Sequence, residues 1–200
     1  MKQIAVVILN WNGAALLERF LPTVIKNSGE IAHIYVADNG STDSSKELLN
    51  TKFPQVSIIE MPFNKGFAGG YNLALKDLNE PLFCLLNSDV APSENWLNPI
   101  ITAFKSDPQL AIAQPKILDE LKKTHFEYAG AAGGYLDALG YPFCRGRIFQ
   151  DIEEDLGQYN DSIEVFWATG ACMFIRNEVF NRLNGFDESY FAHQEEIDLC

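Results

Sequence analysis

Residues 4–13 read IAVVILNWNG, and this stretch decides the fold. The run Ile4–Leu9 is apolar and rich in β-branched residues, which is typical of a strand buried on both faces of a parallel sheet. Asn12-Gly13 ends the run. From Leu16 to Ile25, apolar residues recur every fourth position, which predicts a helix, and Pro22 is expected to kink or split that helix.

The alternation of strand and helix continues through the first half of the chain. Ser41 or Ser44 can cap the helix that follows the second strand, and Ser44 with Glu47 fits a capping box. The further strands are predicted at 31–37, 56–60 and 82–86, and the further helices at 69–78 and 96–104. This order predicts an α/β fold with a mostly parallel central sheet and helices on both faces.

The second half of the chain is less regular. Glycines and an acidic run mark residues 125–161, which we interpret as a loop-rich insertion or lid. Residues 166–175 predict a strand, residues 177–183 a short helix, and Glu195 the start of another helix. The chain stops at Cys200 in the middle of that pattern, so we expect a single domain over 1–200 that is truncated at its C-terminus.

Charge and cysteine content limit the function. The formal net charge is −12, so the broad basic surface that binds nucleic acid is missing, and direct adhesion to anionic lipid is disfavoured. The four cysteines are widely spaced, which favours free thiols over disulfides or zinc ligands and predicts a cytoplasmic protein. No stretch is long enough to span a bilayer.

Polar clusters follow three of the predicted strands directly. They are Asn10-Trp11-Asn12 after the first strand, Asp38-Asn39 after the second, and Asn87-Ser88-Asp89 after the fourth. The carboxyl ends of parallel strands share one edge of the sheet, where such sheets bind ligands. Asp89 is a candidate ligand for Mg²⁺ or Mn²⁺ and Asp38 for a base or ribose, although each also fits an ordinary turn aspartate.

Three further segments carry polar or small residues suited to binding. The loop with Asn64, Lys65 and Gly66 runs into a helix that contains Asn72, so its backbone amides could meet phosphate or ribose. Trp167, Thr169 and Gly170 combine a ring face for a sugar with room for a ligand, or simply pack in the core. Together with His193, they are the candidate contacts for the acceptor.

The third segment is acidic. His193 precedes Glu195 and Glu196, which are either a general-base site or acids stabilised by a helix N-terminus.

In this order, the segments resemble the family 2 inverting glycosyltransferases, especially their rhamnosyltransferase-like branch. The resemblance rests on VVILNWNG (6–13), VADNGSTD (36–43), NKGFAGGYNLAL (64–75), CLLNSDV (84–90), WATGACMFIR (167–176) and GFDESYFAHQEEIDLC (185–200). It implies the Rossmann-like GT-A fold, with a nucleotide-binding half (1–110) and an acceptor and catalytic half (111–200).

The resemblance also implies roles for individual residues. Asp38, with Asn10 and Trp11, is expected to contact the nucleotide base. Asp89 stands where the family's D-x-D motif places its metal-binding aspartate, and Asn87 replaces the first aspartate as a contact for ribose or sugar. Glu196 stands in the place of the catalytic base, with Glu195 as its rival.

The predicted function is therefore inverting sugar transfer from a nucleoside-diphosphate sugar, with dTDP-rhamnose as the branch's common donor, in bacterial surface polysaccharide synthesis. The expected acceptor is a glycan or glycolipid, and segments outside this sequence could hold the protein at the inner face of the membrane. Two alternatives stay open. A sugar nucleotidyltransferase would need a basic loop after the first strand, and LNWNGAALLE (9–18) has no Lys or Arg. A non-catalytic nucleotide-sugar-binding module would not need the acids Glu195 and Glu196.

Overall fold

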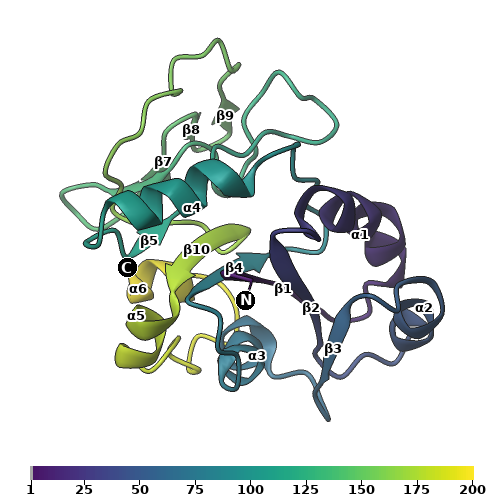
Figure 1. Cartoon of the computed structure of the whole chain (residues 1–200). Coiled ribbons are helices and arrows are strands. Elements are labelled where there is room, and N and C mark those ends of the chain that lie inside the picture. Colours follow the sequence, from purple (N-terminus) through teal and green to yellow (C-terminus); the bar gives the residue numbers. More distant parts are fainter. Residues whose placement is uncertain (1) are drawn as a thin grey trace.

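The computed structural model describes residues 2–200 and is built around a six-stranded sheet with the order β3-β2-β1-β4-β10-β5 (Figure 1). The strands β1 to β4 are mutually parallel, whereas β10 is antiparallel to both of its neighbours, β4 and β5. The bounds are β1 (Ile4–Asn10), β2 (Ala32–Asp38), β3 (Ser57–Glu60), β4 (Leu82–Leu86), β5 (Ile112–Ala113) and β10 (Cys172–Arg176). The predicted mostly parallel sheet is confirmed, and β10 makes it a mixed one.

Helices cover both faces of this sheet, because alternate residues of each strand point to opposite sides. In β1, Ile4, Val6 and Ile8 pack in one apolar core and Ala5 and Val7 in the other. The first core contains α1 (Ala14–Ser28), α2 (Ser45–Lys52) and α4 (Leu97–Ser106). The second contains α3 (Gly66–Leu75) and α5 (Asn177–Arg182), with the end of α6 (Glu195–Leu199) packed against it. Figure 1 shows α1 and α4 above the sheet and α3, α5 and α6 below it.

Two local predictions differ from the structure. Pro22 does not split α1, since the burial of Leu17, Leu21 and Val24 against the sheet holds the helix together. Ser44 is the N-cap of α2 but its side chain makes no capping hydrogen bond. The carboxylate of Asp43 accepts the hydrogen bond from the backbone N–H of Ser45 instead, at 3.0 Å.

The segment predicted to be a loop-rich insertion contains a second, antiparallel sheet. Its four strands are β6 (Gly134–Leu136), β7 (Pro142–Cys144), β8 (Arg147–Ile148) and β9 (Asp151–Ile152). Strands this short cannot show a period of two in the sequence, which explains why the prediction missed them. A third apolar cluster lies under this small sheet and includes Phe126, Cys144 and Trp167.

The strand predicted at 166–175 is shorter than expected and belongs to the central sheet. Only Cys172–Arg176 forms β10, because the chain turns at Thr169–Ala171, where the Ala171 N–H donates to Thr169 Oγ1 at 3.2 Å. Since β10 lies between β4 and β5, the second half of the chain completes the sheet that the first half begins.

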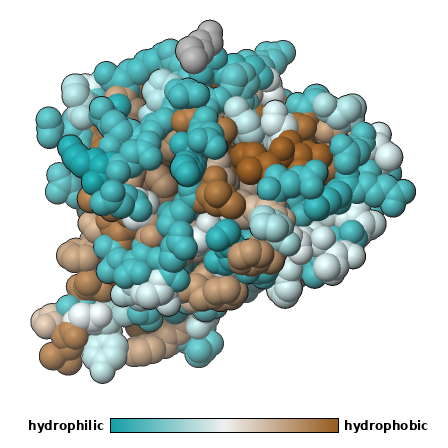
Figure 2. All heavy atoms as spheres, turned by 90° about the horizontal axis from the view of Figure 1, so that it is seen from below, coloured by the Kyte–Doolittle hydropathy of each residue, from teal (hydrophilic) through white to brown (hydrophobic). Residues whose placement is uncertain are grey.

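One face of the protein is largely hydrophilic (Figure 2) and the cysteines are unpaired, as the net charge and the wide spacing of the cysteines predict. The face seen from the side of α3 and α5 is largely hydrophilic, with small hydrophobic patches (Figure 2). All four cysteines are free thiols, of which Cys84, Cys144 and Cys172 are buried. Within residues 2–200, no helix has the length and apolar character that crossing a membrane requires.

A buried carboxylate joins β2 to the turn before β4. Glu80 contacts the His33 ring and accepts a hydrogen bond from the Tyr35 hydroxyl at 3.0 Å. Burial opposes ionisation of Glu80, but the hydrogen bonds from His33, the backbone and Tyr35 outweigh it and lower its pKa below the usual 4.5. Burial, with Glu80, also raises the pKa of Tyr35 to about 12.

We therefore expect Glu80→Gln to remove a stabilising contribution that depends on pH. A carboxylate with a lowered pKa in the folded state stabilises the protein above its unfolded pKa, and this contribution is lost as the pH falls through the folded value. Chemical denaturation between pH 7 and 3 should show wild type losing its advantage over Glu80→Gln below about pH 4.5. Glu30→Gln, at an exposed position, is the control. A constant difference between wild type and Glu80→Gln across this range would contradict the assignment.

Candidate active site

The ends of three strands and the start of a fourth meet at one edge of the central sheet. In the register of β1 with β2, Asn10 lies opposite Asp38. Leu86, the last residue of β4, pairs with Cys172, the first residue of β10. The segments after β1, β2 and β4 therefore converge with the segment before β10. Asn87 joins two of them, because its N–H donates to the Ala171 carbonyl at 2.9 Å.

Asp38 is held inside this edge by its own loop. The side chain is 0% exposed, and its oxygens accept hydrogen bonds from the Ser41 N–H at 3.0 Å and Asn10 Nδ2 at 3.3 Å. Lys46 Nζ lies 3.9 Å from Asp38 Oδ1. A contact between Asp38 and a nucleotide base would therefore require the Ser41 loop to shift. Asn10 Oδ1 is buried without a partner, and Trp11 beside it is 58% exposed.

The loop after β1 is fastened to the loop after β2 by Asn12, the last residue of the polar cluster predicted after the first strand. Asn12 has a left-handed backbone with φ of 52°. Its Oδ1 accepts hydrogen bonds from the N–H groups of Thr42 at 2.7 Å and Asp43 at 3.2 Å. The two loops that carry Trp11 and Asp38 are thus one hydrogen-bonded unit.

Asn39 belongs to the polar cluster predicted after the second strand, but no role of its own could be assigned to it from the sequence. Its buried amide donates to Asn64 Oδ1 at 3.0 Å and to the Gly66 carbonyl at 2.9 Å, and it accepts from the Lys65 N–H at 2.9 Å. These bonds place the predicted Asn64–Gly66 loop next to the end of β2. Its signal in the sequence was its position, one residue after Asp38 at a strand end.

The same loop contacts the segment that leads into α6. The Phe67 N–H donates to the Phe191 carbonyl at 2.7 Å. Gly66 has φ of +73°, and a Cβ at this position would lie 2.2 Å from the Phe191 carbonyl oxygen. Only glycine fits both the backbone and the space.

Asn72 lies in α3, as predicted, but its side-chain amide is already engaged. Its Nδ2 donates to the Phe186 carbonyl and its Oδ1 accepts from the Phe186 N–H, both at 2.9 Å. A further hydrogen bond joins Nδ2 to Glu188 at 3.2 Å. The amide is thus occupied in fastening residues 186–188 to α3, and the predicted contact with a nucleotide sugar does not fit this arrangement.

Of the predicted acceptor residues, Trp167 does not offer a free ring face. Trp167 is 5% exposed, its Nε1 donates to the Tyr135 carbonyl at 3.0 Å, and its ring lies against Gly134. Thr169 is also buried, and its N–H donates to Gln114 Oε1 at 2.8 Å. Gly170 lies against the Phe67 ring, where a Cβ would come within 2.7 Å. The core-packing interpretation therefore fits Trp167.

The acidic pair begins α6, after two residues with left-handed backbones, His193 and Gln194. Glu195 is 3% exposed and Glu196 is half-buried, and each has a buried Oε2 without a hydrogen-bond partner. Burial raises the pKa of Glu195, the neighbouring Glu196 adds to this, and exposed His193 opposes it. Buried carboxylates without partners are costly, so this pair is a candidate for proton transfer.

Helix α6 connects the small sheet to the central sheet. Ile197 packs against the cluster that contains Trp167 and Cys144, and Leu199 packs against the core of the central sheet. The acidic pair thus lies where the two sheets meet, close to the segment 167–171.

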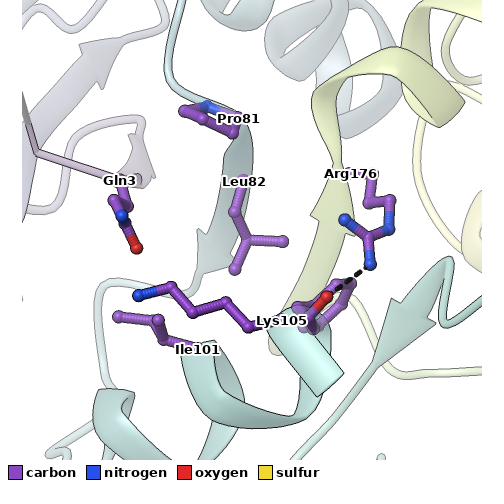
Figure 3. A pocket seen from close by; sticks show the side chains of 7 residues that line it. Gln3, Pro81, Leu82, Ile101, Lys105 and Arg176 are labelled. Atoms are coloured by element: carbon purple, nitrogen blue, oxygen red, sulfur yellow. Dashed lines mark hydrogen bonds between the residues drawn. The ribbon is translucent and has the colours of Figure 1, made fainter. Parts of the chain in front are cut away.

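The best-defined cavities lie elsewhere. One of about 220 Å³ is found at the opposite edge of the central sheet, beside Gln3 and Leu82 (Figure 3). Its Arg176 is engaged with the Phe104 carbonyl at 2.6 Å. Another of about 390 Å³ lies beside Phe126 and β9. Since parallel sheets bind ligands at the carboxyl ends of their strands, we assign the site to that edge.

Asp89 lies at the carboxyl-end edge with an exposed side chain. Residues 2–200 contain no group of three or more His, Cys, Asp or Glu side chains that could hold an ion. One carboxylate nevertheless fits a cation that takes its other ligands from substrate phosphates and water, as Mg²⁺ commonly does.

The fold and the strand-end site define a glycosyltransferase of the GT-A type. The sequence model described as "Glycosyl transferase family 2" matches residues 5–183, so the chain belongs to that family. Two solved structures confirm the fold. A mannosyltransferase of Pyrobaculum calidifontis, in complex with GDP-Man and Mn²⁺, has a TM-score of 0.69 at 15% identity. S. aureus TarS 1–349, in complex with UDP, has a TM-score of 0.68 at 13% identity.

Curated relatives point to glycan synthesis. The chain is 26% identical to an N-acetylglucosaminyl-diphospho-decaprenol L-rhamnosyltransferase of Mycobacterium tuberculosis, over 97% of this chain and 68% of the relative. It is 22% identical to a low-salt glycan biosynthesis hexosyltransferase of Haloferax volcanii, over 100% of this chain and 61% of the relative. The two structural matches include 100% of this chain, which spans only 51% and 54% of the length of the two neighbours.

The contact between Gly66 and Phe191 yields a testable expectation. Gly66→Ala adds a methyl group that must displace the Phe191 backbone, so we expect lower stability and lower transferase turnover. Gly140→Ala is the matched control, because Gly140 also has a positive φ but no atom lies within 4 Å of its Cβ position. Both variants incur the left-handed backbone cost of about 1–2 kcal/mol. Equal thermal unfolding midpoints for the two would contradict the contact.

Proposed function

We propose that this protein transfers a sugar from a nucleoside-diphosphate sugar to an acceptor hydroxyl with inversion at the anomeric carbon. The observation that carries the proposal is the buried acid pair of α6, joined by Phe191 to the Gly66 loop at the strand ends. An acid that can take a proton thus lies beside a loop suited to holding a nucleotide. The relatives' names, an L-rhamnosyltransferase and a glycan biosynthesis hexosyltransferase, support a rhamnosyl donor and glycan synthesis. We propose dTDP-rhamnose as that donor and surface polysaccharide as the product.

On the donor side, we assign the base and ribose to the residues after β1 and β2. Trp11 is exposed enough to stack on a base, and Asn10 has a free buried acceptor atom. Asp38 holds the Ser41 loop that borders this position. Asn64, Lys65 and Gly66 are placed beside it by Asn39, and Asn87 lies on the other side, next to Ala171.

The diphosphate needs positive charge, which a protein of net charge −12 supplies poorly from its own side chains. We assign Asp89 as the residue that holds Mg²⁺ or Mn²⁺ together with the donor diphosphate. Such an ion would stabilise the negative charge that grows on the leaving diphosphate. The Mn²⁺ in the Pyrobaculum calidifontis complex supports this assignment.

On the acceptor side, Glu196 is the general base. It is half-buried, so one side of its carboxylate can meet an acceptor hydroxyl while Oε2 stays enclosed. Glu196 takes the hydroxyl proton as the acceptor oxygen forms its bond to the anomeric carbon and the bond to the diphosphate breaks. Attack opposite the leaving group inverts the anomeric carbon. Glu195 is more deeply buried than Glu196 and is its rival for this role.

The acceptor we propose is a glycan on a lipid carrier, met at the inner face of the cytoplasmic membrane. The Mycobacterium tuberculosis relative, whose name contains a diphospho-decaprenol acceptor, supports this choice. The four free thiols fit a reducing compartment.

Glu196→Gln should lower the rate of sugar transfer by about 10²- to 10⁴-fold, because the amide cannot accept the proton. Binding of the donor nucleotide, measured by calorimetry, should stay within about twofold if Glu196 acts only as base. Glu195→Gln is the control, and we expect it to keep most of the activity because Glu195 does not contact the acceptor. If Glu195→Gln is the inactive variant and Glu196→Gln the active one, the two roles are reversed.

Asp89→Asn should weaken metal-dependent nucleotide binding, since the amide is a poorer ligand for a divalent cation than the carboxylate. Calorimetric titration of UDP and dTDP with and without Mn²⁺ should show the metal enhancement in wild type and little of it in the variant. Ser88→Ala, at the preceding residue, is the control. An undiminished metal enhancement in Asp89→Asn would remove Asp89 from the metal site.

A further inference from the structure

Arg147, in β8 of the small sheet, has hydrogen-bonding capacity that the described residues leave unused. Its guanidinium lies 4.3 Å from the centre of the Tyr128 ring. Nη1 donates to the Phe149 carbonyl at 2.9 Å, but Nε is buried without a partner. The Cys144 thiol lies within hydrogen-bonding reach of Arg147. Because a thiol is a weak acceptor, the rest of the guanidinium keeps the capacity to bind a stronger, anionic one.

Arg145, two residues earlier, differs from Arg147 because its guanidinium is already paired. Its Nε donates to the Ala132 carbonyl at 3.0 Å and its Nη1 pairs with the Asp161 carboxylate at 3.2 Å. Its guanidinium also stacks on an aromatic ring, that of Tyr159, at 5.1 Å. Among the ion pairs of residues 2–200, Arg147 takes part in none. Of two stacked arginines in one hairpin, only Arg147 keeps its positive charge without an anionic partner.

Arg147 also lies on the side of the small sheet that faces the acidic pair. It pairs in register with Cys144, which is buried in the cluster under the sheet, against which Ile197 of α6 packs. Burial raises the pKa of the Cys144 thiol. The charge of Arg147 and its hydrogen bond with the thiol lower that pKa, whereas the charges of Glu127 and Glu196 raise it. The guanidinium and Glu196 are therefore both near Cys144.

We propose that Arg147, stacked on Tyr128, binds a phosphate group of the acceptor. The proposal rests on the proposed sugar transfer, since it places this phosphate on the acceptor side of Glu196. A guanidinium offers parallel N–H groups that match two phosphate oxygens, and stacking on an aromatic ring holds its plane fixed. Tyr128 and Phe149, which are 48% and 84% exposed, flank the position. The matching ligand is a phosphate attached to an apolar chain, as in a lipid-linked glycan.

The test measures binding without sugar transfer. Geranyl diphosphate, inorganic pyrophosphate and geraniol are titrated into the protein by calorimetry in EDTA, so that the metal-dependent donor position does not capture them. We expect both diphosphates to bind wild type, and Arg147→Met to weaken them about ten- to hundredfold. Arg145→Met, at the arginine already paired with Asp161, should bind as wild type does.

Two further measurements separate the interpretations. Arg147→Lys keeps the positive charge and should bind the diphosphates with intermediate affinity. If Arg147→Met loses binding while its thermal unfolding midpoint is unchanged, the loss is not a folding defect. Tighter binding of geranyl diphosphate than of pyrophosphate identifies the lipid carrier as the source, and equal binding identifies the phosphate alone. Unchanged affinity in Arg147→Met, or displacement of the probe by excess UDP, would overturn the proposal. Because no turnover is measured, this result is independent of whether Glu196 proves to be the base.

Discussion

The pairing of β1 with both of its neighbours is the constraint on which the site depends. β1 is hydrogen-bonded in parallel to β2 and to β4, so the strand ends are level and their loops face the same volume. A shift of one residue would turn the core side chains of β1 to the other face. The buried runs Ile4–Ile8 and Leu82–Leu86 fix this register, and the positions of Asn10, Asp38 and Asn87 follow from it.

The fold and the strand-end residues could be predicted because they depend on local patterns. Buried β-branched runs and helical spacing identified the sheet and its helices, and polar residues after each strand identified the edge. The acid pair was predicted from its position at a helix start, and the structure gives it the burial that a proton-transfer role needs. The role of Asn39 in that edge could not be predicted, because an asparagine after a strand looks like any turn residue until its partners in residues 64–66 are known.

The remaining differences arise from contacts between residues far apart in the sequence. Asn72 is 114 positions from Phe186, with which it exchanges two hydrogen bonds, and no local pattern reveals that pairing. Trp167 was a candidate sugar platform until the small sheet placed Gly134 against its ring. Pro22 was expected to disrupt α1 on local grounds, and tertiary burial overrides that preference.

If the protein transfers sugar as proposed, charge would give the small sheet a role in that reaction. An acidic protein that handles diphosphates must place positive charge at particular positions, and several cations are already committed: Lys46 to Glu60 and Asp38, Lys116 to Asp155, and Arg145 to Asp161. The donor diphosphate can be met by backbone amides and a metal at Asp89, neither of which requires a basic surface. An acceptor phosphate on the far side of Glu196 has neither, so a free guanidinium there is the group that the reaction would need.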